Sequence, residues 1–149
     1  MRSCVFCRIA AGESPASVIY EDAECMAFMD LYPIRSGHLL VMPRRHAVHL
    51  RDLSAPEQAR LFELAMRVLA ALRASGVVPD AANLLVNDGP DSGQHVPHVH
   101  IHLVPRARLD AVGFMGAFLS RVVHFARRSG RRSHLDALAA RIRTHLPAG

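Results

Sequence analysis

The sequence predicts an α+β fold built around a largely antiparallel sheet of about five strands. Five short segments are apolar or alternate apolar with polar residues, and turn-forming residues bound them. One long segment in the middle of the chain has apolar residues at helical spacing, and the last third again has a helical pattern. Strands, a long helix, strands and helices in this order are typical of an α+β domain.

The predicted strands are short, and so are most of their connections, which favours antiparallel neighbours. Glycine, proline, aspartate or asparagine residues flank them. The five strands are predicted at Val18–Tyr20, Cys25–Met29, Leu39–Met42, Asn83–Val86 and Val99–Val104.

The long helix is predicted to begin after Ser54, which can cap it, while Glu57 can close a capping box. Ser75 and Gly76 end it. A single apolar stripe indicates that the helix packs on the sheet. The stripe consists of Leu61, Leu64, Ala65, Val68, Leu69 and Leu72.

The C-terminal third reads as two helical pieces hinged near Ser129 and Gly130. Nine of the eighteen arginines lie from Arg106 onward, and the chain has no lysine. A solvated helix face is the default interpretation of these arginines, and contact with nucleic acid is the less favoured one. We expect a domain core at residues 1–110 and a helical, Arg-rich extension of the same domain at residues 111–149.

Length and composition also limit the class of protein. A chain of 149 residues, half of them apolar, can form one sizeable core. The net charge of +5 favours anionic partners such as phosphates and nucleotides. Three cysteines are too few for a disulfide framework and indicate a reducing compartment. Because no signal-peptide pattern or membrane-length apolar run is present, we expect a cytoplasmic protein without a membrane partner.

Three histidines alternate with apolar residues in the last predicted strand. Residues at i and i+2 of a strand share one face, about 6.5 to 7 Å apart. One face therefore carries imidazoles and the other carries apolar side chains: His98, His100 and His102 against Val99, Ile101 and Leu103. Two interpretations remain open at this point. A histidine pair can chelate a metal ion, and a neutral imidazole can attack phosphorus while its neighbours bind the phosphate oxygens.

The surroundings of the histidines favour the nucleophile. The loop Gly89–Gln94 can present main-chain N–H groups to an anion, and Asn87 precedes it. Asp30 can accept hydrogen bonds from ribose hydroxyls, and His38 begins another apolar strand. No acidic residue lies near the histidines at the spacing that a cupin-like metal site needs.

The segment GQHVPHVHIHLVPR resembles the signature of the histidine triad (HIT) superfamily. The segment CVFCRIAAGESPASVIYEDAECMAFMDLYPIRSGHLLVMPRRH resembles the N-terminal half of the same family, in particular its bacterial HIT-like branch. The resemblance extends from Cys4 to Arg106 and leaves the C-terminal helices outside. It implies a HIT-like fold, makes residues 1–110 the HIT domain core, and implies nucleotidyl transfer through a covalent nucleotidyl-histidine.

The resemblance also implies a role for individual residues. His100 matches the nucleophile that attacks the α-phosphorus, and the main-chain carbonyl of His98 matches the group that fixes its tautomer. His102 and the main chain around Gly93 to His95 match the phosphate-binding groups. Gln94 belongs to this phosphate-binding main chain. The remaining implied site consists of the supporting histidine His38, the ribose-binding acid Asp30, the phosphate-positioning Asn87, and the base-pocket residues Phe6, Ile9 and Leu31.

One position departs from the family pattern. His95 stands where relatives usually carry serine or threonine, the hydroxyl that helps the leaving group. An imidazole titrates near neutral pH, so His95 is a candidate general acid, with a solvent-facing side chain as the alternative.

The pair Cys4 and Cys7 has the C-x-x-C spacing that lets two thiolates bind one zinc ion, although a redox pair has the same spacing. Some bacterial relatives bind structural zinc with such a pair and two histidines. By that resemblance the histidines here are His46 and His98, so we expect structural zinc and no organic cofactor.

The resemblance therefore implies a homodimeric hydrolase of purine nucleoside monophosphate derivatives. Expected substrates are adenosine-containing phosphoramidates or adenylated amines, followed by diadenosine polyphosphates. The alternatives are a nucleotide-binding or interaction module without turnover and, less favoured, a metal-dependent hydrolase that uses the histidine row.

Overall fold

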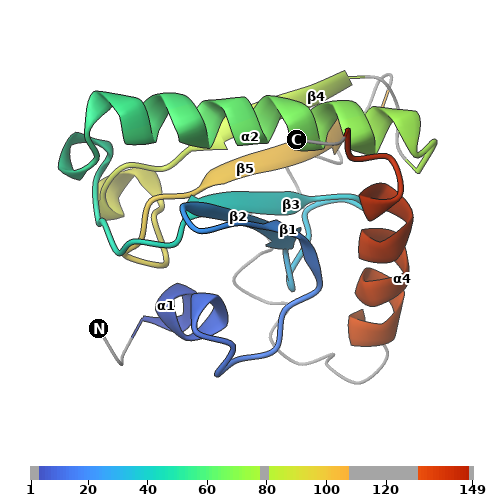
Figure 1. Cartoon of the computed structure of the whole chain (residues 1–149), viewed down its shortest axis with the longest axis horizontal. Helices are drawn as coiled ribbons and strands as arrows, with labels where there is room; N and C mark the ends of the chain where they lie inside the picture. The colour runs from blue at the N-terminus through green and yellow to red at the C-terminus, as the bar shows by residue number, and fades with distance from the viewer. Residues whose placement is uncertain (1–3, 78–80, 108–130, 148–149) are drawn as a thin grey trace.

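A computed structural model describes residues 4–77, 81–107 and 131–147 (Figure 1). Short 3₁₀ turns at Leu50–Asp52 and Pro90–Ser92 interrupt the loops. The helices and strands in chain order are α1 (Val5–Ala10), β1 (Val18–Glu21), β2 (Cys25–Met29), β3 (Leu39–Pro43), α2 (Ala55–Ala74), β4 (Ala81–Val86), β5 (Ile101–Arg106) and α4 (Arg131–Arg143).

Within the described residues, five strands form one antiparallel sheet in the order β1-β2-β3-β5-β4. This confirms the predicted class and strand number. The strand β5 begins at Ile101, two residues later than predicted, because the main-chain N–H of Val99 donates to the carbonyl of Ala47 at 2.8 Å instead of extending the ladder. Since β5 lies between β3 and β4, the segment that carries the histidines enters the interior of the sheet.

Helices cover both faces of the sheet (Figure 1). The helix α2 lies along one face, where the odd-numbered strand residues such as Ala27, Val41 and Ile101 form its apolar core. The short helix α1 lies against the opposite face and packs on even-numbered residues such as Phe28 and Leu40. The two-residue period of the strands thus separates two clusters of side chains.

The long helix follows its prediction closely. The carboxylate of Glu57 accepts the main-chain N–H of Ser54 at 2.8 Å and completes the capping box. Every residue of the predicted apolar stripe is buried. No helix among the described residues is long and apolar enough to cross a membrane.

The C-terminal helix α4 adds to the core on the α2 face. Its residues Leu135, Ala139 and Ile142 are buried in the same apolar cluster as α2. The predicted first helical piece, the hinge at Ser129 and Gly130, and the boundary at residue 110 lie outside the described residues.

The helix α1 was not predicted, and it changes the environment of the histidines. Its residues Val5–Ala10 are too few to show helical periodicity in sequence. Because α1 covers the sheet, the imidazole face of the histidine strand is buried as well as its apolar face. His98, His100 and His102 are buried, at 0%, 4% and 5% exposure.

Candidate functional site

The candidate site is a cluster of buried histidines on the α1 face of the sheet. The rings of His100 and His102 lie 4.6 Å apart between their centroids. Phe6 of α1 meets His100 edge-on at 5.1 Å and His98 at 5.9 Å. The aromatic ring therefore excludes water from one side of the histidines and limits the rotation of both rings.

Hydrogen bonds to main-chain carbonyls assign the tautomers of two histidines. Nδ1 of His100 lies 2.7 Å from the carbonyl oxygen of His98. Since a carbonyl only accepts, Nδ1 carries the proton and the lone pair lies on Nε2. In His98 the arrangement is reversed, because Nε2 donates to the carbonyl of Pro43 at 2.8 Å and leaves the lone pair on Nδ1. Two neighbouring histidines thus present opposite nitrogens for chemistry.

A second chain of hydrogen bonds assigns the tautomer of His102. The main-chain N–H of Ile34 donates to Nδ1 of His38 at 3.1 Å, so that nitrogen is unprotonated. Nε2 of His38 then carries the proton and donates to Nδ1 of His102 at 3.0 Å. The remaining proton of His102 lies on Nε2, where it can be donated to an oxygen anion. The pair therefore prepares His102 as a hydrogen-bond donor.

Asp30 lies at the end of β2, next to His38. It is 5% exposed, its Oδ1 accepts the main-chain N–H of Tyr32 at 2.8 Å, and its Oδ2 is 3.4 Å from Nδ1 of His38. Nδ1 of His38 is nearer to the Ile34 amide than to the Asp30 carboxylate. Because an amide N–H can only donate, this shorter contact keeps Nδ1 unprotonated. The structure thus places Asp30 beside the histidine cluster, and its role toward ribose stays a prediction.

Four metal-binding side chains meet at the start of α1. Ligand atoms of Cys4, Cys7, His46 and His98 lie within 4.8 Å of one another. The Sγ atom of Cys7 is 3.2 Å from Nδ1 of His46 and 3.7 Å from Nδ1 of His98, and Sγ of Cys4 is 3.6 Å from the latter. In tetrahedral zinc sites, with Zn–S about 2.3 Å and Zn–N about 2.1 Å, sulfur and nitrogen ligands are roughly 3.6 Å apart. The donor set and its spacing therefore fit zinc.

The protonation of these ligands also bears on metal binding. Burial lowers the pKa of His98 to about 4, so its imidazole is neutral at pH 7. Its Nε2 is held by the Pro43 carbonyl, the kind of outer contact that orients a metal-binding histidine. Burial and the neighbouring Cys4 raise the pKa of Cys7 in the metal-free protein, so a bound cation has to displace the thiol proton.

Among the described residues, a second group could hold a metal: Asp30, His38 and His102. Neither group contains more than one of the three triad histidines, and His100 belongs to none. The arrangement therefore does not favour the alternative in which His98, His100 and His102 together bind one metal ion.

The loop between β4 and β5 folds back on itself beside the histidines. Asn87 donates its side-chain N–H to the carbonyl of Gly93 at 3.2 Å, and Gln94 accepts the main-chain N–H of Gly89 at 2.9 Å. Gly89 and Gly93 have φ of +103° and +85°, which side chains disfavour. The two glycines allow the tight turn that brings Asn87 and Gln94 together.

The other predicted residues are distributed around this cluster. Ile9 packs on the α1 side, whereas Leu31 packs against the apolar cluster on the α2 side. His95 is exposed in the segment that follows Gln94. The base-pocket roles of Ile9 and Leu31 and the general-acid role of His95 stay predictions.

Two groups that matter for the site gave no signal in the sequence. The carbonyl of Pro43 and the main-chain N–H of Ile34 fix the tautomers of His98 and His38, but any residue type supplies such groups. Only the fold shows that β3 and the loop before it deliver them to the histidines.

The fold and its buried histidines define an α+β protein with a histidine-triad site. These histidines are His38, His98, His100 and His102. The HIT domain family model matches residues 11–109, and the chain belongs to the HIT family. An uncharacterized HIT-like protein of Mycobacterium tuberculosis is 43% identical over 102 residues, which cover 68% of this chain and 70% of that protein.

Two further comparisons bear on chemistry. Adenosine 5'-monophosphoramidase of Schizosaccharomyces pombe is 36% identical over 104 residues, 70% of this chain and 74% of the enzyme. The crystal structure of a zinc-bound histidine triad family protein from Mycobacterium smegmatis superposes with a TM-score of 0.78 at 34% identity, covering 97% of this chain and 94% of that one.

Proposed function

We propose that the protein hydrolyses nucleoside monophosphate derivatives through a covalent nucleotidyl-histidine on His100. The observation that carries the proposal is the 2.7 Å contact between Nδ1 of His100 and the carbonyl of His98. It holds the lone pair on Nε2, the atom that has to attack phosphorus, without any proton transfer beforehand. Family membership and the monophosphoramidase relative support the same class of reaction.

The reaction has two displacements at the α-phosphorus. Nε2 of His100 forms a bond to phosphorus while the bond to the leaving group breaks, and the leaving group takes up a proton, for which His95 is the proposed donor. Water then attacks the phosphorus, the phosphorus–nitrogen bond breaks, and nucleoside monophosphate leaves. His102 donates from Nε2 to the phosphate oxygens, where negative charge increases in each transition state.

The remaining contacts are assigned to substrate binding. The loop that contains Asn87, Gly93 and Gln94 binds the phosphate, and Asp30 binds the ribose hydroxyls. Phe6, Ile9 and Leu31 are proposed to contact the base. The proposed substrates are purine, in particular adenosine, phosphoramidates or adenylated amines, with diadenosine polyphosphates next; the relative from Schizosaccharomyces pombe supports this order.

Intact-mass spectrometry tests the covalent step. The protein is mixed with adenosine phosphoramidate, quenched in alkali to preserve phosphorus–nitrogen bonds, and compared with His100→Ala. We expect an adenylyl adduct on the wild type alone. Equal turnover by both proteins without an adduct would contradict the nucleophile, and tight AMP binding without turnover would favour the binding module.

We also propose that Cys4, Cys7, His46 and His98 hold a structural zinc ion. Zinc would supply no step of the reaction; it would tie α1 to the segment whose His98 carbonyl orients His100. The ligand spacing and the zinc-bound relative support this assignment. Metal content by mass spectrometry should give one zinc per chain in the wild type and none in Cys7→Ser, with a lower melting temperature, while Cys25→Ser keeps the metal.

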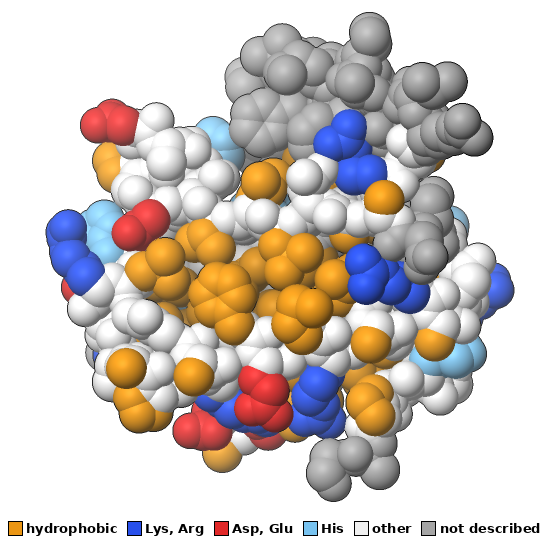
Figure 2. Space-filling model, turned by 90° about the horizontal axis from the view of Figure 1, so that it is seen from above, with side chains coloured by type: hydrophobic (Ala, Val, Ile, Leu, Met, Phe, Trp, Pro, Cys, Tyr) orange, Lys and Arg blue, Asp and Glu red, His pale blue; other side chains and the backbone are white. Residues whose placement is uncertain are grey.

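We further propose a homodimer formed through the face that carries α2 and β4. Figure 2 shows apolar side chains gathered on this face. The helix α2 carries two exposed large apolar side chains, Phe62 and Met66, which are 43% and 51% exposed. Among the described strands β4 is at the sheet edge and pairs only with β5. Large exposed apolar side chains beside an open strand edge are typical of an interface. Sedimentation should give a dimer that Phe62→Glu converts to monomer.

The cysteines also bear on the proposed cellular location. All three cysteines are free thiols, which supports the proposal of a reducing, cytoplasmic environment.

A further inference from the structure

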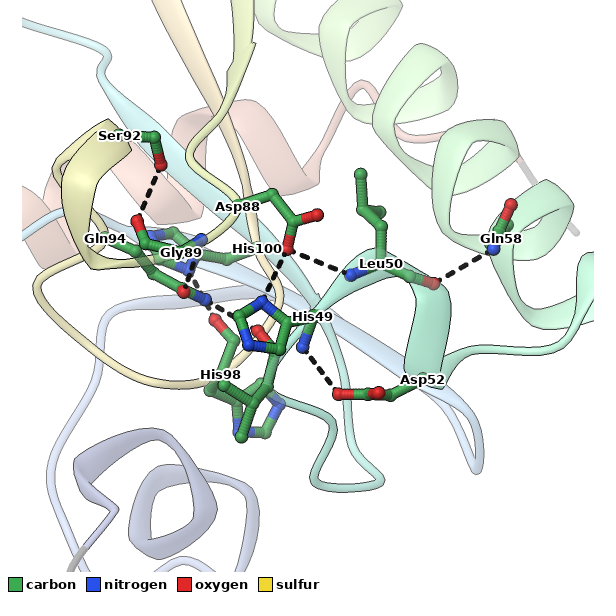
Figure 3. A network of polar contacts seen from close by, with 11 residues as sticks. His49, Leu50, Asp52, Gln58, Asp88, Gly89, Ser92, Gln94, His98 and His100 are labelled. Atoms are coloured by element: carbon green, nitrogen blue, oxygen red, sulfur yellow. Dashed lines mark hydrogen bonds and ion pairs between the residues drawn. The ribbon is translucent and has the colours of Figure 1, made fainter.

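A network of polar contacts connects the proposed phosphate loop to the segment that follows β3 (Figure 3). Oδ1 of Asp88 accepts from Nδ1 of His49 at 3.1 Å and from the main-chain N–H of Leu50 at 3.2 Å. The side chain of Gln94 makes a second connection, donating to the carbonyl of Val48 at 2.8 Å. The loop is thus attached at both of its ends to residues 48–50.

The segment on the other side of these contacts is itself held firmly. The carboxylate of Asp52 accepts the main-chain N–H of His49 at 2.8 Å, and Gln58 of α2 donates to the carbonyl of Leu50 at 3.0 Å. The carbonyl of Ala47 accepts the main-chain N–H of Val99 at 2.8 Å, between two histidines of the triad. Residues 47–50 therefore form a fixed support for the loop.

Asp88 places a negative charge in the proposed phosphate loop. It stands between Asn87 and Gly89, within the segment that we propose binds an anionic phosphate. A negative charge at such a position repels the substrate unless a hydrogen-bond donor holds the carboxylate away. His49 supplies such a donor: its ring is 24% exposed, Asp88 is 40% exposed, and Cε1 of the ring lies 3.8 Å from the position a Cβ atom on Gly89 would take.

We propose that His49 is a positioning residue of the phosphate loop, acting through Asp88. It holds the carboxylate against the 47–50 support, so that the loop presents its main-chain N–H groups and not its negative charge to the nucleotide. The inference rests on the proposed function, because it requires that the loop binds phosphate. His49 contacts neither the triad nor the metal ligands in the described network, so its effect is on nucleotide affinity and not on the chemical step.

Steady-state kinetics with adenosine phosphoramidate and calorimetry with AMP test this role. His49→Leu removes the donor, and we expect KM and the AMP dissociation constant to rise about threefold to fivefold, with kcat changed less than twofold. His49→Gln keeps a donor and should recover most of the affinity. The double variant His49→Leu/Asp88→Asn removes the uncompensated charge and should also recover it. Glu21→Gln breaks the exposed pair with Arg44 and serves as the matched control.

The outcomes separate this inference from the function on which it rests. If the wild type neither binds AMP nor turns over the substrate, the proposed function fails and the role of His49 with it. If the wild type binds AMP and His49→Leu binds it equally, only the role of His49 fails. A fall in kcat and in thermal stability without a change in affinity, not recovered in the double variant, would identify a purely structural contact.

Discussion

The two faces of the sheet differ in chemistry although the same strands supply both. On the α2 face, strand residues meet the stripe of α2 and part of α4, and the cluster is apolar throughout. On the α1 face, the cluster contains cysteines and phenylalanine, and the buried histidines lie against it. Among the described residues, no buried side-chain nitrogen or oxygen lacks a hydrogen-bond partner. The α2 face therefore supplies most of the apolar core, whereas the α1 face carries the buried histidines of the proposed site.

Two adjacent residues of one segment test this division most directly, because they point to opposite faces. His100→Ala, on the α1 face, should lower turnover of adenosine phosphoramidate by about 10³-fold or more, since the proposed nucleophile is lost. Its melting temperature should remain within a few degrees of the wild type, because the site is at the margin of the apolar core. Single-turnover kinetics on folded protein measure the loss. A variant that retains a tenth of the wild-type rate would move the chemistry to another residue.

Ile101→Ala, one residue further on, should show the opposite behaviour. Ile101 is fully buried on the α2 face, and truncation of such a side chain costs about 2–5 kcal/mol of the free energy of unfolding. Urea unfolding measures this loss. The kcat of the remaining folded protein should stay within about twofold, and a selective loss of kcat would show that the two faces are not independent.

The sequence predicts the α2 face better than the α1 face, for a physical reason. The stripe from Leu61 to Leu72 and the alternation of the strands follow directly from hydrophobic periodicity, and the capping box of Ser54 and Glu57 is a local pattern. Such signals depend on neighbours in sequence. The fold class, the sheet and the start of α2 could therefore be predicted from residues alone.

The α1 face depends on contacts that no local pattern carries. The six residues of α1 cover the histidines, and Phe6 contacts residues more than ninety positions away. The alternation of histidines and the C-x-x-C spacing pointed to the triad and the cysteine pair, whereas His38 and His46 were predicted only through the family resemblance. The tautomers of the histidines, the carbonyl of Pro43 and the contact between His49 and Asp88 could be seen only in the tertiary structure.

His38 tests whether the hydrogen-bond chain on the α1 face has catalytic importance. His38→Phe keeps an aromatic ring but removes the donor to Nδ1 of His102, so the tautomer of His102 is no longer fixed. We expect kcat to fall about 10–100-fold, as for other groups that orient a reactive side chain. His38→Gln retains a donor and should be affected less, which distinguishes tautomer control from packing. Equal kcat values for the two variants, in folded protein, would argue for packing alone.

The smallest expected effect is on the α2 face, where Asp22 connects the β1–β2 turn to α2 through an ion pair with Arg60. Burial raises the pKa of Asp22, but hydrogen bonds from the main-chain N–H groups of Cys25 and Glu24 and from Arg60 outweigh it and lower the pKa to about 2. A lowered pKa means that the ionised form stabilises the fold: this contribution is complete above about pH 4 and is lost as the pH falls toward 2.

Asp22→Asn should therefore cost about 1 kcal/mol of the free energy of unfolding at pH 7. The difference from wild type in urea unfolding should shrink below pH 4, whereas Glu13→Gln, at an exposed position, should cost nothing measurable, and neither change should alter kcat. A loss of kcat in Asp22→Asn without a loss of stability would contradict the assignment of this face to stability.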